Sequence, residues 1–311
     1  MQRIDVQREA DISAGKLGRA PDHSFGELLQ RYLDEVSIHK DGSQFERVRL
    51  LSLIGAPGKD GTPRVPDPLS QVRLPNLGPE HFAAWRDRRL ASVSAATVLR
   101  VWNLLSSACT RAVNEWRWIP SNPMSGVSRP AEPPPRTRRN SQDEIERILH
   151  ACGYSRDEPP INQQERVGAA FLFAIETAMR AGEICALRWT DIDGRVARVR
   201  SIEKGARKTK TGRTVPLSGE AMRILEQLRS INKDQVFAIR PSLLDALFRK
   251  AKSRAMIDDL HFHDTRAEAL TRLSKKVDVM QLARISGHKD IKILYNVYYR
   301  EKMEDIVNLL D

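Results

Sequence analysis

Cysteine and long apolar runs are both scarce in this 311-residue sequence. Cys109, Cys152 and Cys185 are odd in number and lack CxxC spacing, which argues against a disulfide framework and a zinc site and fits a reducing compartment. We expect them to be small buried residues. The most apolar stretch, Val167–Ile175, is far too short to span a bilayer and predicts a core helix instead.

The first twenty residues lack the apolar segment of a signal peptide, because Arg3, Asp5, Arg8 and Glu9 interrupt them. We therefore expect a cytoplasmic protein. Charge is abundant and unbalanced: 51 Lys and Arg residues face 40 Asp and Glu residues, which gives a formal net charge of +11 and a pI of about 9.8. A polyanionic partner is expected, with nucleic acid favoured over an anionic membrane surface.

A proline- and arginine-rich segment divides the chain. Residues 130–140 include three consecutive prolines, as well as Arg136, Arg138 and Arg139, and this composition predicts a linker. Ser141 and Glu144 follow as a capping box, which announces a new helix. The expected organisation is an N-terminal tail at 1–21, a helical domain at 22–129, the linker at 130–140 and a second domain at 141–311.

Both domains are predicted to be mainly helical. In the first, helical spacing is clearest from Ser94 to Ala112 and weaker at Phe25–Val36 and His81–Leu90, while the Gly- and Pro-rich stretch Gly55–Pro79 predicts a loop or irregular hairpin. In the second, β-branched residues at 195–202 and 213–217 flank a segment rich in Lys, Gly and Thr, which is typical of a small hairpin or three-stranded sheet. The fold class is therefore mainly α with a small β-sheet.

Five segments of the second domain carry polar residues that suit neither a core nor an ordinary surface. They are TAMRAGEICALRW with Arg180, KTKTGRTVPL with Lys210, HFHDTRAEAL with His263 and Arg266, SGHKD with His288, and YNVYYR with Tyr295, Tyr298 and Tyr299. Each signal alone has an ordinary explanation, such as a structural ion pair between Arg180 and Glu183. Their order along the chain is what is specific.

In this order the segments resemble those of tyrosine recombinases of the phage integrase type, over nearly all of Ser141–Asp311. The segment RVWNLLSSACTRAVNEWRWIPSNPM is also similar to the last helix of that family's core-binding domain. The resemblance implies a helical core-binding, DNA-binding domain joined to an α+β catalytic domain. It also implies site-specific cleavage and rejoining of DNA through a 3′-phosphotyrosine, in DNA recombination or integration by a mobile element, with neither ATP nor a metal or other cofactor.

The implied catalytic residues are Arg180, Lys210, His263, Arg266, His288 and Tyr298. Two arginines can hold phosphate oxygens bidentately at every relevant pH. A tyrosine needs help to ionise, since its unperturbed pKa is about 10, so His263 is assigned to proton handling, and Lys210 becomes the general acid for the leaving 5′ oxygen. His288 is assigned a further hydrogen bond to the phosphate.

Some assignments stay open within this resemblance. The family tyrosine usually follows the Gly-His histidine by about nine residues, a position held here by Val297; Tyr298 is therefore chosen on nearness, with Tyr299 as the alternative and Tyr295 as a packing aromatic. Lys204 and Lys208 could replace Lys210, because hairpin register is not fixed by sequence. Ala178 stands where the family commonly has glycine, and Ala267 where a second histidine is often found.

The same residues allow two other functions to be considered. His261, His263, Asp264 and His288 could be written as ligands of a metal-dependent nuclease, although Arg266 would repel a cation. A DNA-binding protein that has lost strand cleavage is the other rival.

The expected partner is double-stranded DNA at recombination sites. We expect both domains to clamp it, with Arg136, Arg138 and Arg139 near its backbone. A homotetramer on DNA and accessory DNA-bending or directionality proteins are also expected.

Overall fold

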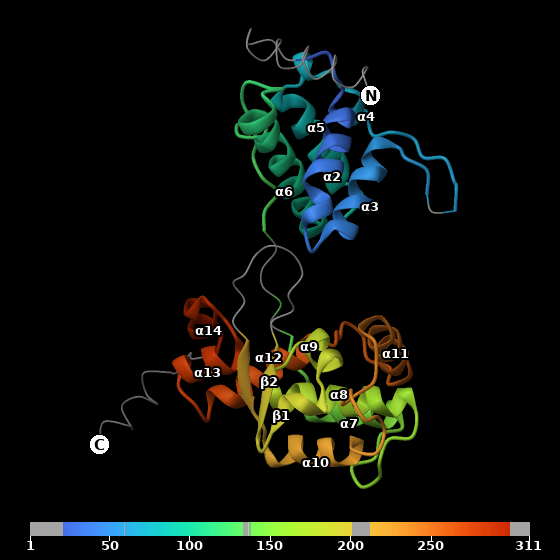
Figure 1. Cartoon of the computed structure of the whole chain (residues 1–311), viewed down its shortest axis with the longest axis vertical. Coiled ribbons are helices and arrows are strands. Elements are labelled where there is room, and N and C mark those ends of the chain that lie inside the picture. Colours follow the sequence, from blue (N-terminus) through green and yellow to red (C-terminus); the bar gives the residue numbers. More distant parts are fainter. Residues whose placement is uncertain (1–20, 59, 133–135, 137, 201–211, 299–311) are drawn as a thin grey trace, which may run out of the picture. The chain divides into compact units, whose positions relative to one another are not determined.

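The computed structural model describes residues 21–58, 60–132, 136, 138–200 and 212–298. It forms two compact units, one before the proline run and the other from Arg136 onward (Figure 1). The division falls inside the segment 130–140. Each unit has its own hydrophobic core and is described by itself.

The first unit is helical. Its elements are α2 (Phe25–Glu35), a 3-10 turn (Ser37–His39), α3 (Ser43–Ile54), α4 (Pro68–Gln71), a 3-10 turn (Leu74–Asn76), α5 (Pro79–Leu90), α6 (Ala95–Arg111) and a π-turn (Ala112–Trp116). Helix α2 begins where predicted, at Phe25, and is capped by Ser24, whose hydroxyl accepts from the Glu27 backbone in a capping box. Its apolar face packs against α3, α4 and α6.

Helix α3 was absent from the sequence prediction. Only Leu50 of this helix is fully buried, while Phe45 is 70% exposed and Val48 50% exposed. Because its apolar residues do not share one face, α3 has no periodic signal by which to recognise it. The following stretch, Gly55–Pro79, is mostly irregular, as expected, apart from α4 and its neighbouring turn.

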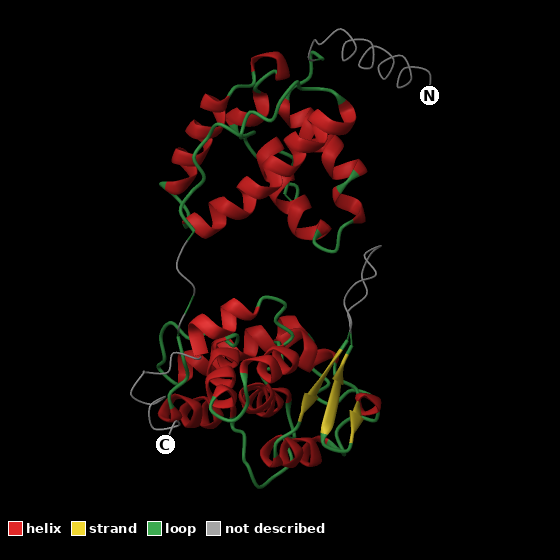
Figure 2. Cartoon of the chain, turned by 90° about the vertical axis from the view of Figure 1, so that its left-hand side faces the viewer, coloured by secondary structure: helices red, strands yellow, loops and turns green. Residues whose placement is uncertain are grey.

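The second unit combines helices with a small sheet (Figure 2). Its helices are α7 (Gln142–Cys152), α8 (Gln163–Thr177), α9 (Ala181–Ala186), α10 (Gly219–Leu228), α11 (Pro241–Arg254), α12 (Asp264–Ser274), α13 (Val279–Ser286) and α14 (Ile291–Tyr298). Helix α7 starts at the predicted capping box of Ser141 and Glu144. The mainly helical fold class with a small sheet is confirmed.

The sheet has three antiparallel strands in the order β1 (Ile192–Asp193), β2 (Val196–Val199) and β3 (Arg213–Pro216). Ala197 of β2 pairs with Val215 of β3, and both side chains are fully buried. Helix α13 packs against β3. The sheet therefore connects β2, which ends just before residues 201–211, to α13, which ends just before Gly287 and His288.

Helix α8 lies at the centre of this unit. It contacts α7, α9, α10, α11 and α12, and the predicted core stretch Val167–Ile175 is buried within it. Phe171 packs against Phe248 and Phe262, with ring centroids 5.5 and 6.2 Å away. Burying an aromatic side chain of this size contributes about 2–3 kcal/mol, so α8 is a rigid base for the residues at its end.

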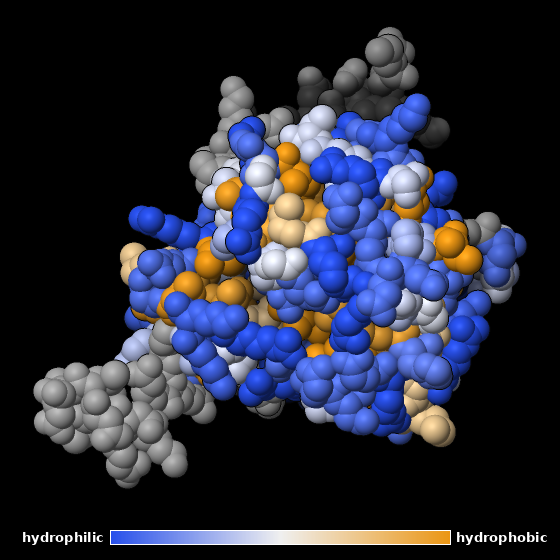
Figure 3. Space-filling model, turned by 90° about the horizontal axis from the view of Figure 1, so that it is seen from below, coloured by the Kyte–Doolittle hydropathy of each residue, from blue (hydrophilic) through white to orange (hydrophobic). Residues whose placement is uncertain are grey.

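The cysteines and the polarity of the surface agree with the composition of the sequence. All three cysteines are free and buried, as predicted, and burial raises the pKa of the Cys109 thiol to about 12. Within the described ranges, no helix combines the length and apolar character needed to cross a bilayer. The face shown in Figure 3 is largely hydrophilic, with hydrophobic surface in small patches.

Candidate active site

The end of α8 turns the chain so that Arg180 leaves the core. Ala178 adopts the left-handed conformation (φ 55°), ends α8 and is fully buried. Arg180 then caps α9: its backbone N–H donates to Glu183 Oε2 at 2.8 Å, and its Nη1 lies 3.1 Å from Glu183 Oε1. The expected ion pair is therefore present. The Arg180 side chain remains 45% exposed and is accessible to a ligand.

Arg266, in contrast, is buried to 4% exposure on α12. Its Nη1 donates to the carbonyl oxygen of Ala178, and its Nη2 to that of Ser286 at 2.5 Å. Burial, with Arg180 and Arg213 nearby, lowers the pKa of Arg266 to about 10. The guanidinium is thus still charged at neutral pH, and two carbonyl groups fix its orientation.

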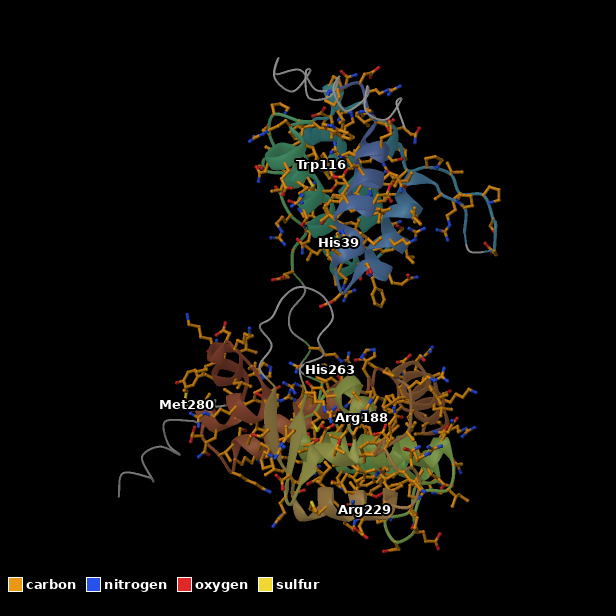
Figure 4. The ribbon with its side chains drawn as sticks, viewed as in Figure 1. His39, Trp116, Arg188, Arg229, His263 and Met280 are labelled. Atoms are coloured by element: carbon orange, nitrogen blue, oxygen red, sulfur yellow. The ribbon has the colours of Figure 1, made fainter. Side chains whose placement is uncertain are left out.

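Two histidines lie in the same electrostatic environment. His263, labelled in Figure 4, precedes the first residue of α12, and His288 follows Gly287, a left-handed glycine (φ 73°) at the end of α13. His288 Nδ1 is 2.7 Å from Ser286 Oγ. Burial, together with Arg266 and Arg180, lowers the pKa of both histidines, to about 4 for His288. Both are therefore neutral at pH 7.

Tyr298 is the last residue of α14 and is half-buried. It packs against a small cluster that includes Ala178, Leu282 and Leu294. Burial raises the pKa of Tyr298, while the charges of Arg266 and Arg139 act in the opposite direction. The hydroxyl is thus a protonated phenol within the field of Arg266.

Tyr295 does not pack as predicted. It is 59% exposed, so its interpretation as a packing aromatic is wrong. Leu294 and Tyr298 are four residues apart and share the inner face of α14, whereas Tyr295 lies about 100° around the helix from Leu294. Lys204, Lys208, Lys210 and Tyr299 lie outside the described residues.

The linker arginines are paired with carboxylates of the second unit. Arg136 donates to Asp264 and Asp259, Arg138 to Glu144, and Arg139 to Glu268. Asp264 and Glu268 are buried on α12, the helix of Arg266. DNA contact by these three arginines stays a prediction. The structure adds a second role, since Arg136 and Arg139 bind α12 and Arg138 binds α7.

Arg213 was not among the predicted site residues. This side chain on β3 donates from Nη1 and Nη2 to the two Glu183 oxygens, at 2.7 Å each. Burial acts to raise the pKa of Glu183, but the bonds from Arg213 and the Arg180 backbone hold it at about 2. The only sequence signal was an arginine in the strand that follows the predicted lysine hairpin, and that signal is too common to single it out.

The gathered groups form a cationic site. Arg180 and Arg213 both form ion pairs with Glu183. Together with burial, these two arginines lower the pKa of Arg266, and all three arginines lower that of His288. Such a site favours a bound anion with several oxygens, as in a phosphodiester.

The histidine and aspartate positions do not form a metal site. Across the described part of the chain, no group of at least three His, Cys, Asp or Glu side chains is arranged to hold a metal ion. Asp264 instead accepts hydrogen bonds from Arg136 and from the His261 backbone. The four residues considered as ligands of a metal-dependent nuclease therefore do not form a metal-binding group in the described part of the chain.

Comparisons with known proteins identify the family and the fold. Residues 138–305 match the model of the phage integrase family. An integrase/recombinase homologue of Haemophilus influenzae is 42% identical over 304 residues, covering 96% of this chain and 78% of the relative. A shufflon-specific DNA recombinase of Escherichia coli is 32% identical over 302 residues, covering 93% of this chain and 72% of the relative.

Solved structures show the same fold. A lambda integrase dimer bound to a COC′ core site matches with a TM-score of 0.69 at 17% identity, covering 90% of this chain and 79% of that chain. A lambda integrase tetramer bound to a Holliday junction matches with a TM-score of 0.66 at 18% identity, covering 86% and 78%. From the family match and the two relatives, the chain belongs to the phage integrase family of tyrosine recombinases.

Proposed function

We propose that this protein is a site-specific DNA recombinase that cleaves and rejoins strands through a 3′-phosphotyrosine, without ATP or metal. One observation carries the proposal: Arg180, Arg266, His263 and His288 share one electrostatic environment, and Tyr298 lies in the field of Arg266. Phosphate-binding cations and a candidate nucleophile are thus brought together from segments more than a hundred residues apart.

The reaction follows from the charges. Arg180 and Arg266 bind the non-bridging oxygens of the scissile phosphate and stabilise the extra negative charge that develops on them. The Tyr298 oxygen attacks phosphorus and gives its proton to His263, which is neutral and able to accept it. The bond from phosphorus to the 5′ oxygen breaks, and Lys210 protonates that oxygen as it leaves.

Rejoining is the same step in reverse. A 5′ hydroxyl gives its proton to Lys210 and attacks the phosphotyrosine, while the Tyr298 oxygen leaves and takes its proton back from His263. The number of phosphodiester bonds is therefore conserved and no ATP is consumed. His288 donates a hydrogen bond to the phosphate in both directions. Its contact with Ser286 Oγ restrains the imidazole ring near Arg266.

The substrate is double-stranded DNA carrying recombination sites, to which the net charge of +11 draws the protein. The two units act as a clamp on the duplex in the cytoplasm. Exchange between two duplexes requires four active sites, and a lambda integrase of the same fold has been solved as a tetramer on a Holliday junction. We therefore place four copies on the synaptic DNA, with accessory DNA-bending or directionality proteins setting the outcome.

A covalent adduct tests this function directly. The wild-type protein is incubated with nicked duplexes carrying the attachment sites of its own element, and denaturing gels are run with and without EDTA. The expected result is a protein–DNA adduct that EDTA does not reduce. Tight DNA binding without an adduct would identify the alternative, an inactive DNA-binding protein on this scaffold, and an adduct-free cleavage that requires divalent metal would identify a nuclease.

A further inference from the structure

Arg213 occupies a junction between three segments of the second unit. Its two terminal nitrogens bind both oxygens of Glu183, and its Nε donates to the carbonyl oxygen of Ile285 at 2.8 Å. The side chains of Arg213 and Glu183 are only 14% and 13% exposed. Every guanidinium nitrogen therefore has an acceptor inside the protein.

Each acceptor of Arg213 adjoins a residue of the candidate site. Glu183 also receives the backbone and side-chain donors of Arg180. Ile285 precedes Ser286, whose carbonyl accepts from Arg266 and whose hydroxyl contacts His288. Arg213 thus connects β3 to both sides of the candidate site, and all its guanidinium nitrogens are bonded to protein acceptors.

Gly287 provides a separate line of evidence. A Cβ built at this position would lie 3.0 Å from Cδ of Arg213 and 3.4 Å from its Nε. The arginine side chain therefore passes directly over the glycine of the Gly-His pair. The glycine serves two purposes, since its φ of 73° also disfavours any other residue.

We propose that Arg213 is a positioning residue that sets the geometry of Arg180, Arg266 and His288 and ties them to strand β3. A lysine could not replace Arg213, because one ammonium group cannot bind both carboxylate oxygens and a carbonyl in this planar arrangement. The inference rests on the proposed function for its kinetic consequence, but not for its structural one.

The kinetic test compares Arg213→Gln, Arg213→Lys, Glu183→Gln and the double variant on the nicked substrate. We expect Arg213→Gln to slow adduct formation roughly 100-fold and to change DNA affinity less than about threefold. Small displacements of the catalytic side chains reduce the rate of the chemical step more than they weaken DNA binding. Arg213→Lys should recover less than tenfold. The double variant should be no slower than the slower single variant, since both remove one interaction.

Arg198→Gln is the matched control. Arg198 forms an ion pair with Asp193 in the same sheet, but the two side chains are 63% and 72% exposed. Its substitution should leave the rate of adduct formation unchanged. If Arg213→Gln behaves like this control, or if Arg213→Lys restores the full rate, the positioning role is overturned.

A measurement on the free protein separates this inference from the proposed function. The titration of His288 is followed by NMR of its imidazole nuclei in the wild type, in Arg213→Gln and in Gly287→Ala. Loss of Arg213 removes a nearby positive charge and loosens the packing around His288, so its pKa should rise by at least one unit, whereas a merely stabilising residue would leave it unchanged.

Gly287→Ala should raise the same pKa while keeping the arginine, because the added methyl group displaces the Arg213 side chain. Circular dichroism checks that each variant is folded. An unchanged His288 pKa in both variants would overturn the inference. If the wild type forms no adduct, the proposed function fails, but the titration still decides the role of Arg213.

Discussion

Arg266 donates a hydrogen bond to the carbonyl oxygen of Ala178, a fully buried residue with left-handed backbone geometry. The turn at the end of α8 therefore orients the buried arginine as well as ending the helix. A left-handed alanine costs roughly 1–2 kcal/mol relative to ordinary backbone geometry. This cost is located directly beside a predicted phosphate-binding residue, where strain is often retained for function.

Replacing Ala178 with glycine should leave stability nearly unchanged. Relief of the left-handed strain offsets the loss of a buried methyl group and the greater freedom of the unfolded chain, so the free energy of unfolding should change by less than about 0.5 kcal/mol. Ala174, equally buried within α8, is the control. Ala174→Gly should lower the free energy of unfolding by about 2 kcal/mol in urea titrations; equal losses in the two variants would contradict the strain argument.

Stability should fall as the pH drops from 6.5 to 4.5. The pKa of His288 is about 4 in the folded protein and near 6.5 in the unfolded chain, and that of His263 is also lowered. The unfolded state therefore binds more protons in this window. The stabilising contribution is complete above pH 6.5 and declines as the pH approaches the folded pKa, by about 1–2 kcal/mol for a partly solvated histidine.

Urea unfolding at pH 4.5, 5.5, 6.5 and 7.5 measures this dependence. His288→Gln should reduce the loss between pH 6.5 and 4.5. His150→Gln, at an exposed position on α7, should leave it as in the wild type. An identical pH dependence in both variants would mean that His288 is not the group responsible.

Arg136 and Arg139 should separate into a structural and a DNA-binding residue. Arg136 uses all its guanidinium nitrogens on Asp264, Asp259 and the Asp259 carbonyl. Arg136→Gln should lower the free energy of unfolding by about 2 kcal/mol, because it leaves the buried Asp264 carboxylate without its cation. It should not alter the salt dependence of DNA binding.

Arg139 is different because it bonds Glu268 through Nε and its side chain is 52% exposed. Arg139→Gln should reduce the slope of log affinity against log salt concentration by about 1, the effect of losing one phosphate contact. Fluorescence anisotropy between 50 and 300 mM salt measures both slopes. A reduced slope for Arg136→Gln alone would reverse the assignment.

The sequence singled out candidate catalytic residues but not the residues that support them. Arg180, His263, Arg266 and His288 were predicted as site residues because their residue types follow a recognisable order. Arg213 was not, since its role arises from an ion pair with a residue thirty positions earlier and from a glycine far along the chain. Pairings of this kind depend on tertiary packing, which leaves no local pattern.

The helices also differ in how well the sequence predicted them. The amphipathic pattern and capping boxes located α2 and α7 to within a residue or two, because local hydrogen bonds and one buried face define those helices. Helix α3 escaped prediction because it buries a single side chain completely. The prediction for Tyr295 was wrong because successive residues of a helix point about 100° apart, so Tyr295 faces solvent although its neighbour Leu294 is buried.

Tyr295 and Tyr298 of α14, together with Tyr299, allow a test of which tyrosine is the nucleophile. Tyr298 is half-buried in the field of Arg266, whereas Tyr295 is exposed on a different face of the helix. Tyr298→Phe removes only the hydroxyl oxygen, so adduct formation should fall at least 1000-fold while DNA affinity changes little. Tyr295→Phe and Tyr299→Phe should each retain the adduct on the nicked substrate, and an adduct that survives Tyr298→Phe but is lost in Tyr299→Phe would make Tyr299 the nucleophile.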